Sequence, residues 1–154
     1  MTTMRERIAE LLWGYAEAID DDTLERWPGF FIEDAVYQIT SRASCDAGLP
    51  IGIMLCEGRG MMEDRVNALR TANIYEPHRY RHMLGRPHIK TASGVTAVRT
   101  SFLVHRIAQD GETVLFASGD YRDEVVEEGP VLRFKSRRVV LDSPRVDVLL
   151  VVPL

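Results

Sequence analysis

Residues 73–85 read Asn-Ile-Tyr-Glu-Pro-His-Arg-Tyr-Arg-His-Met-Leu-Gly, and the fold assignment starts from this stretch. Pro77 disfavours helix at the residue before it, so the chain is predicted to become an extended strand here. Side chains alternate between the two faces of a strand. One face therefore holds His78, Tyr80 and His82, and the other holds Arg79, Arg81 and Met83. Neither face is simply apolar, so each needs polar partners or a binding surface.

Three interpretations of this strand compete. It could be the wall of an active site, with His78 or His82 as an acid, a base or a metal ligand. It could be a buried polar ladder, or a subunit interface in which arginine and tyrosine act as anchors. On one strand the two histidines lie about 13 Å apart, too far to share one metal ion. A single histidine in a strand is also more often a hydrogen-bonded structural residue than a ligand.

The composition indicates one ordinary globular domain spanning residues 1–154. The net charge is −4 and there is no basic run, which argues against a nucleic-acid partner. No apolar run approaches the roughly 20 residues of a membrane span, and the first residues lack the apolar core of a signal peptide. Cys45 and Cys56 form no Cys-x-x-Cys pair. The chain is therefore expected to be a reduced, cytoplasmic protein that does not enter a membrane.

Helices are predicted in the first half of the chain. An apolar stripe predicts a helix over Met4–Ile19. Asp22 and Glu25 have the spacing of a capping box, so Asp22 is expected to begin a second helical turn with Leu24 and Trp27 inward. A metal site at the acidic run from Asp20 to Asp22 stays open as the alternative. The other expected elements of this half are a strand at Ala35–Thr40, a loop at Ser41–Pro50, a strand-like run at Ile51–Cys56 and a helix at Met61–Ala72.

The second half is predicted to be a curved antiparallel sheet. The strand from His78 to Lys90 should bend at Gly85 and Pro87. Asp110-Gly111 and Glu128-Gly129-Pro130 are turn signals that separate long alternating segments. Those segments are Val95–Ala108, Glu112–Glu127 and Val131–Asp142. Strands of this length require strong curvature, for which Ser118 and Gly119 are the expected bend points. The apolar tail Val146–Leu154 is expected to pack on the sheet or on a partner.

Helices followed by a long meander indicate an α+β fold. The sheet would wrap around the helices as a cone, which either binds a ligand or is filled by side chains. The sequence has no Gly-x-Ser-x-Gly elbow, and neither cysteine has the histidine spacing of a Rieske cluster. No 2-His-1-carboxylate set is convincing either.

Three groups of residues carry a resemblance to a known family. They are Arg26-Trp27-Pro28 with Phe30-Phe31, the stretch Asn73–Gly85, and Phe116-Ala117-Ser118-Gly119 with Tyr121-Arg122-Asp123. Over essentially its whole length the chain resembles the small (beta) subunits of Rieske non-haem iron aromatic-ring-hydroxylating dioxygenases. Within that family it is most similar to the terephthalate-type members, including the ending Pro153-Leu154.

The resemblance implies a nuclear transport factor 2-like cone and a mainly structural role. The Rieske [2Fe-2S] cluster and the mononuclear Fe(II) would lie in a large (alpha) subunit, so the resemblance assigns no catalytic and no metal-binding residue to this chain. The chain would assemble with that subunit and with other beta subunits as an alpha3beta3 hexamer, to which an NADH-dependent reductase supplies electrons. Interface or polar-scaffold residues are then expected among Tyr75, Arg79, Tyr80, Arg81, His82, Arg137 and Arg138.

The alternative is a stand-alone protein on the same cone fold. A dehydratase or isomerase would use His78 or His82 with Asp34 or Asp120 as an acid–base pair. A simple ligand-binding protein would have the same pocket without that pair.

Overall fold

The computed structural model describes residues 1–48, 52–71, 77–143, 145 and 152–154. Its helices are α1 (Met4–Asp20), the 3-10 helix η1 (Leu24–Phe30), α2 (Arg42–Asp46) and α3 (Arg59–Thr71). Its strands are β1 (Phe31–Ser41), β2 (Met54–Glu57), β3 (His78–Leu84), β4 (His88–Ala92), β5 (Val95–Ala108), β6 (Thr113–Glu128) and β7 (Val131–Leu141). The α+β class predicted from the sequence is confirmed.

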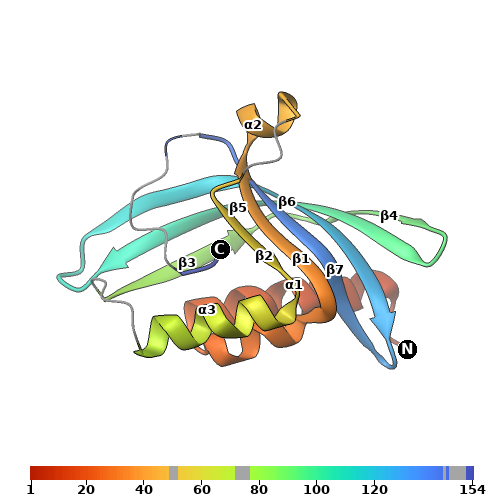
Figure 1. The fold of residues 1–154 in the computed structure, drawn as a ribbon. Coiled ribbons are helices and arrows are strands. Elements are labelled where there is room, and N and C mark those ends of the chain that lie inside the picture. Colours follow the sequence, from red (N-terminus) through yellow and green to blue (C-terminus); the bar gives the residue numbers. More distant parts are fainter. Residues whose placement is uncertain (49–51, 72–76, 144, 146–151) are drawn as a thin grey trace.

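Within the described residues the strands form one curved sheet in the order β2-β1-β7-β6-β5-β3, with β4 also pairing with β5. β5, β6 and β7 are the predicted antiparallel meander. β1 pairs with β7 in parallel, and the other described pairs are antiparallel. α1 and α3 lie under the sheet, and α2 lies on its other side (Figure 1). The sheet therefore has an inner face toward α1 and α3 and an outer face away from them.

Two features of the sequence stabilise α1, a cap at its N-terminus and an apolar stripe along one face. The Thr3 hydroxyl accepts from the Glu6 N–H, and the Glu6 carboxylate accepts from the Thr3 N–H, which is a complete capping box. Ile8, Leu12 and Tyr15 on the inward stripe are buried. Their spacing of three and four residues places them on one helix face, as the sequence predicted.

The capping box predicted for Asp22 and Glu25 is wrong. The structure begins η1 after Thr23, which makes no side-chain cap, and Asp22 has a positive φ of 57°. Both carboxylates instead bind Arg70, at 3.0 Å from Asp22 and 2.8 Å from Glu25. Ion pairs with Arg70 of α3 thus replace the local capping hydrogen bonds that the sequence predicts for Asp22 and Glu25. Leu24 and Trp27 are buried, as predicted.

Three predicted boundaries also change. Residues 42–46 of the expected loop form α2, because the Ser41 hydroxyl accepts from the Ser44 N–H and starts a helical turn. β2 begins only at Met54 and continues to Glu57. β1 extends from Phe31 rather than from Ala35. Of the apolar tail, Leu154 is fully buried and Val152 packs against the core, while residues 144 and 146–151 lie outside the described part.

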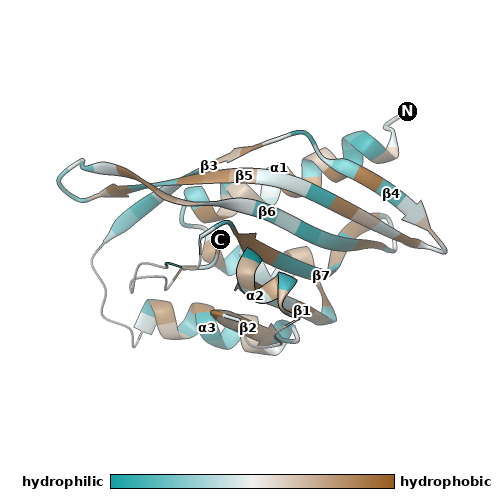
Figure 2. Ribbon diagram, turned by 90° about the horizontal axis from the view of Figure 1, so that it is seen from above, coloured by the Kyte–Doolittle hydropathy of each residue, from teal (hydrophilic) through white to brown (hydrophobic). Residues whose placement is uncertain are grey.

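The strands bend where one chain carries an extra residue. The pairing of β5 with β6 shifts beside Phe116, and that of β6 with β7 shifts beside Lys135. Gly119, an expected bend point, lies at a close approach between strands. A Cβ atom on Gly119 would lie only 2.0 Å from the carbonyl oxygen of Val140. Bands of hydrophilic and hydrophobic residues follow one another along β4 and β5 (Figure 2), as a sheet with one buried face requires.

We predict that Gly119→Ala lowers the free energy of unfolding by about 3 kcal/mol or more, because the obstructing atom belongs to the backbone of β7 and cannot rotate away. Urea denaturation measures this loss. The matched control is Gly60→Ala in α3, where a Cβ atom meets nothing within 4 Å. That change should be neutral or slightly stabilising. If the two variants have equal stability, Gly119 does not lie as close to the Val140 carbonyl oxygen as the structure shows.

Candidate functional site: the cone interior and the outer face of the sheet

β3 alternates as the sequence predicted. His82 and Tyr80 are buried on the inner face and His78 is half-buried, whereas Arg79, Arg81 and Met83 are exposed on the outer face. Tyr80 stacks on Phe116 at 5.4 Å and lies 5.0 Å from the ring of His78. The inner face of β3 is thus a polar ladder inside the cone. Residues 73–76, including the interface candidate Tyr75, lie outside the described residues.

Asp20, at the end of α1, is the partner of His82. One carboxylate oxygen lies 2.6 Å from His82 Nδ1, and the other accepts from the His82 backbone N–H at 2.9 Å. The His82 side chain is fully buried and that of Asp20 nearly so. Within the described residues His82 Nε2 has no hydrogen-bond partner. An imidazole held in this way by a carboxylate has the form of an acid–base pair.

The acid–base partners proposed from the sequence are therefore corrected. Asp120 lies on the outer face and binds Arg99 and Arg122. Asp34 is exposed on β1. Asp20 was considered only for a metal site in the acidic run, because its pairing with β3 crosses 62 positions of sequence. A helix-terminal acid that faces a strand histidine is a tertiary feature without a local sequence signal.

Arg137 and Asp123 form a buried ion pair inside the protein. Arg137 is 1% exposed and donates two hydrogen bonds to Asp123, at 2.9 and 3.2 Å. Its guanidinium lies over three rings, 3.6 Å from the centroid of Tyr121, 4.2 Å from Tyr15 and 4.4 Å from Phe134. Burial raises the pKa of the Asp123 carboxyl to about 6, against the opposing attraction of the Arg137 charge. Arg137 is thus part of the internal scaffold.

Leu154 is buried and hydrogen-bonded to two tyrosines of the core. The hydroxyls of Tyr15 and Tyr37 each donate to the Leu154 backbone oxygen at 2.8 Å. The Leu154 N–H donates to the Tyr37 oxygen at 2.9 Å, and Trp27 Nε1–H donates to the Tyr15 oxygen at 3.0 Å. Burial raises the pKa of both tyrosines, so both remain neutral donors. Buried groups of the chain itself thus take up part of the space between the helices and the sheet.

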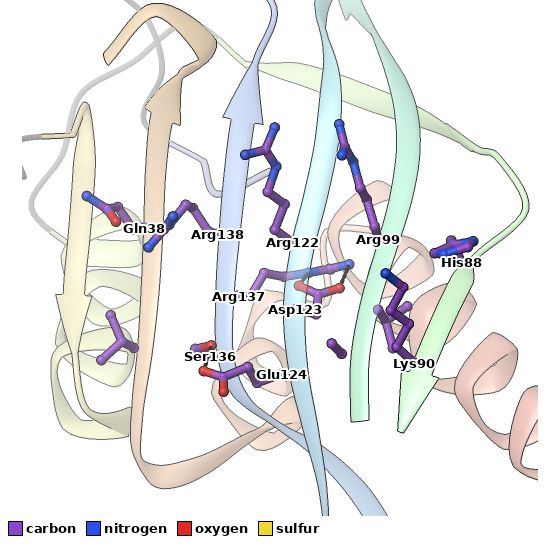
Figure 3. Close-up of a pocket in the computed structure, with 13 residues that line it drawn as sticks. Gln38, His88, Lys90, Arg99, Arg122, Asp123, Glu124, Ser136, Arg137 and Arg138 are labelled. Atoms are coloured by element: carbon purple, nitrogen blue, oxygen red, sulfur yellow. Dashed lines mark hydrogen bonds and ion pairs between the residues drawn. The ribbon is translucent and has the colours of Figure 1, made fainter. Parts of the chain in front are cut away.

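The outer face carries a different arrangement. Strand register places Arg138 opposite Arg122, and Arg122 opposite Arg99, so these three residues of β7, β6 and β5 form a continuous arginine row. Gln38 of β1 and His88 of β4 extend the row at its two ends. Figure 3 shows the three arginine side chains on neighbouring strands. The row lines an open groove of about 540 Å³.

Like charges directly opposite one another on a sheet repel. Asp120 relieves part of this repulsion, since its carboxylate lies 2.6 Å from Arg99 and 3.0 Å from Arg122. Arg138 contacts the Cys45 sulfur at 3.9 Å and pairs with no carboxylate among the described residues. The row therefore favours a partner that brings negative charge.

Of the residues proposed from the sequence, the structure places Tyr80, His82 and Arg137 inside and Arg79, Arg81 and Arg138 outside. Only the second group is available to a partner. The described residues hold no group of three or more His, Cys, Asp or Glu side chains that could bind a metal ion. No helix in the described part is long and apolar enough to cross a membrane.

Residues 1–138 match the SnoaL-like domain family. The chain is 44% identical to a terephthalate 1,2-dioxygenase terminal oxygenase component subunit beta of Comamonas sp., covering 96% of this chain and 97% of that one. It is 40% identical to the anthranilate 1,2-dioxygenase small subunit of Burkholderia cepacia, covering 91% and 88% of the two chains. Among solved structures it resembles a protein described as the beta subunit of an aromatic-ring-hydroxylating dioxygenase of Novosphingobium aromaticivorans. That match has 36% identity and a TM-score of 0.89, and it covers 97% and 96% of the two chains.

We predict that Arg137→Leu lowers the free energy of unfolding by about 3–5 kcal/mol at pH 7, because it leaves the Asp123 carboxylate buried without its cation. The double variant Arg137→Leu/Asp123→Leu should recover much of that loss. In the single variant burial alone acts on Asp123, so its pKa in the folded state lies above the ordinary value and protonation favours folding. The loss should therefore shrink as the pH falls from 7 to 5. If urea titrations show that the loss of unfolding free energy grows toward pH 5, the Asp123 carboxylate is not the cause of the destabilisation.

Proposed function

This chain belongs to the SnoaL-like domain family, among the small (beta) subunits of aromatic-ring-hydroxylating dioxygenases, and we propose that it is the non-catalytic small subunit of a dioxygenase acting on an aromatic acid. Terephthalate is the proposed substrate, since two terephthalate 1,2-dioxygenase beta subunits are 44% and 42% identical to this chain. The reaction would be cis-dihydroxylation with O2 and electrons from NADH. The anthranilate relative at 40% identity makes 2-aminobenzoate the second substrate to test.

The observation that carries the non-catalytic role is the occupied cone. Arg137, Asp123 and Leu154 fill the space between helices and sheet, and each is at most 4% exposed. A catalytic pocket needs room for substrate beside its acid–base groups. The Rieske cluster and the mononuclear iron are proposed to lie in a large subunit, and no step of the reaction is assigned to residues of this chain. The proposed assembly is an alpha3beta3 hexamer in the cytoplasm, served by an NADH-dependent reductase.

The Asp20–His82 pair is the one observation that favours a second candidate, an acid–base enzyme on the same fold. His82 Nε2 has no hydrogen-bond partner within the described residues and could move a proton. The role we propose for the pair is structural. Asp20 also accepts the backbone N–H of His82, so it fastens the end of α1 to β3.

To test the main proposal, the tagged chain is purified from cells that also make its large subunit. Native mass spectrometry should give a complex with equal numbers of both chains, several-fold heavier than the 17.5 kDa chain. The complex should be brown, with the visible spectrum of a Rieske cluster, and should consume O2 with terephthalate faster than with 2-aminobenzoate or benzoate. A colourless species that contains only this chain would refute the subunit proposal.

The second candidate is tested by His82→Gln in the assembled oxygenase. We expect turnover within about 2-fold of the unchanged complex, since removing a general acid or base costs about 100-fold or more. We expect the free energy of unfolding of the isolated small subunit to fall by about 1–3 kcal/mol, because the Asp20 carboxylate loses a buried partner. A 100-fold fall in turnover with an intact complex would instead make His82 a catalytic residue.

A further inference from the structure

Two tyrosine hydroxyls inside the protein are directed at one acceptor atom. Tyr15 of α1 and Tyr37 of β1 both donate to the backbone oxygen of Leu154, each at 2.8 Å. Both tyrosines and Leu154 are fully buried. Buried donors that converge on one oxygen are a common means of binding a carbonyl group, because that oxygen has two lone pairs.

Other hydrogen bonds fix the directions of these two donors. Trp27 Nε1–H donates to the Tyr15 oxygen at 3.0 Å, and the Leu154 N–H donates to the Tyr37 oxygen at 2.9 Å. A tyrosine oxygen that already accepts a hydrogen bond directs its own proton elsewhere, here to the Leu154 oxygen. Leu154 thus supplies what a bound ligand would supply, which is a carbonyl oxygen, a donor on the neighbouring carbon and an apolar body.

A cavity leads from Leu154 toward the surface. It has a volume of about 260 Å³, and its lining includes Leu154 and Phe116 together with the exposed Leu115 and Arg145. Ligand pockets in proteins occupy roughly 300–1,000 Å³. If residues 152–154 left the core, the space that they vacate would join this cavity and bring it into that range.

The core around the two donors favours a neutral ligand with a further polar contact. The Tyr121 ring lies 6.3 Å from the Tyr15 ring, and the residue is 1% exposed. Within the described residues the Tyr121 hydroxyl has no hydrogen-bond partner. The charge of Arg137, which lies over both rings, is paired with Asp123. A ligand that brought its own charge would therefore be buried without a counter-ion, which is costly.

We infer that residues 152–154 are a removable internal ligand, and that the site they occupy binds a small neutral aromatic ketone with a hydroxyl beside its carbonyl group. The ketone oxygen accepts from Tyr15 and Tyr37, and the ligand hydroxyl donates to the Tyr37 oxygen. The ligand ring takes the place of the Leu154 side chain, beside the Phe116 ring that lines the cavity. The inference concerns the interior of this chain and does not depend on the dioxygenase proposal.

The test is isothermal titration calorimetry with 2-hydroxy-1-phenylethanone, on the full chain and on a chain shortened after residue 151. The shortened chain should bind this ketone at least about 10-fold more tightly, because its site is no longer occupied. The analogue 2-phenylethanol, which lacks only the carbonyl oxygen, should bind the shortened chain about 10-fold more weakly than the ketone does. Mandelate, which carries a carboxylate, should bind no better than 2-phenylethanol.

Tyr15→Phe in the shortened chain removes one of the two donors to the carbonyl oxygen. It should weaken binding of the ketone by about 5-fold to 10-fold. Binding of 2-phenylethanol should stay within about 2-fold, because this alcohol has no carbonyl oxygen for Tyr15 to bind.

A second variant covers the case in which the shortened chain does not fold. Leu154→Asp in the full chain should expel the same segment, because a carboxylate is not stable in a buried apolar site without a partner. This variant should bind the ketone as the shortened chain does. The matched control is Val131→Asp, at a position that is 45% exposed, which should bind the ketone no better than the unchanged chain.

Equal affinities of the shortened chain for the ketone and for 2-phenylethanol overturn the inference, since the vacated space is then only an apolar cavity. Tighter binding of mandelate than of the ketone also overturns it, because the site then prefers a carboxylate. A full chain that binds the ketone as tightly as the shortened chain shows that residues 152–154 do not occupy the site. If neither the shortened chain nor Leu154→Asp gives a folded protein by circular dichroism, the segment is an indispensable part of the core and the inference fails.

Discussion

The interior of this protein depends on a buried charge pair that must not be separated. Arg137 can lie at the centre of a cone only because Asp123 neutralises it and three aromatic rings surround its guanidinium. Those rings come from α1, β6 and β7, so the pair fixes how the first helix sits in the sheet. Leu154 completes the same assembly through Tyr15 and Tyr37. The space beneath the sheet therefore holds polar groups that an ion pair and hydrogen bonds link to one another.

This packing of the core is the observation behind the structural role proposed above. A curved sheet over helices offers a cavity whose walls come from many elements, and such cavities suit catalysis when they stay open. Here the chain retains one element of that chemistry, the Asp20–His82 pair, but surrounds it with packed side chains. In the role proposed for it, this pair links α1 to β3. On the outer face, by contrast, Arg99 and Arg138 remain exposed.

Much of the architecture could be predicted from local patterns. Helical periodicity identified α1 and α3, and strict alternation with turn signals identified the meander of β5, β6 and β7. The alternation of β3 also separated Tyr80 and His82 from Arg79 and Arg81 correctly. The predictions that were wrong concerned residues whose partners are distant in the sequence. Arg70 binds both carboxylates of the predicted cap, and Asp20 is hydrogen-bonded to His82, 62 positions away. The arginine row depends on the registers of two strand pairs, β6 with β7 and β5 with β6, which no local pattern specifies.

The parallel pairing of β1 with β7 limits the order in which parts of the protein can fold. β1 begins at Phe31 and its partner β7 at Val131, and Tyr15 bonds to Leu154 across 139 positions. Contacts of such long range form slowly, because a large loop must close before they stabilise anything. During synthesis β1 cannot pair with β7 until residues 131–141 have left the ribosome. Closure of the core is thus a late step of folding, and until then α1 and β1 lack the partners that bury their apolar side chains.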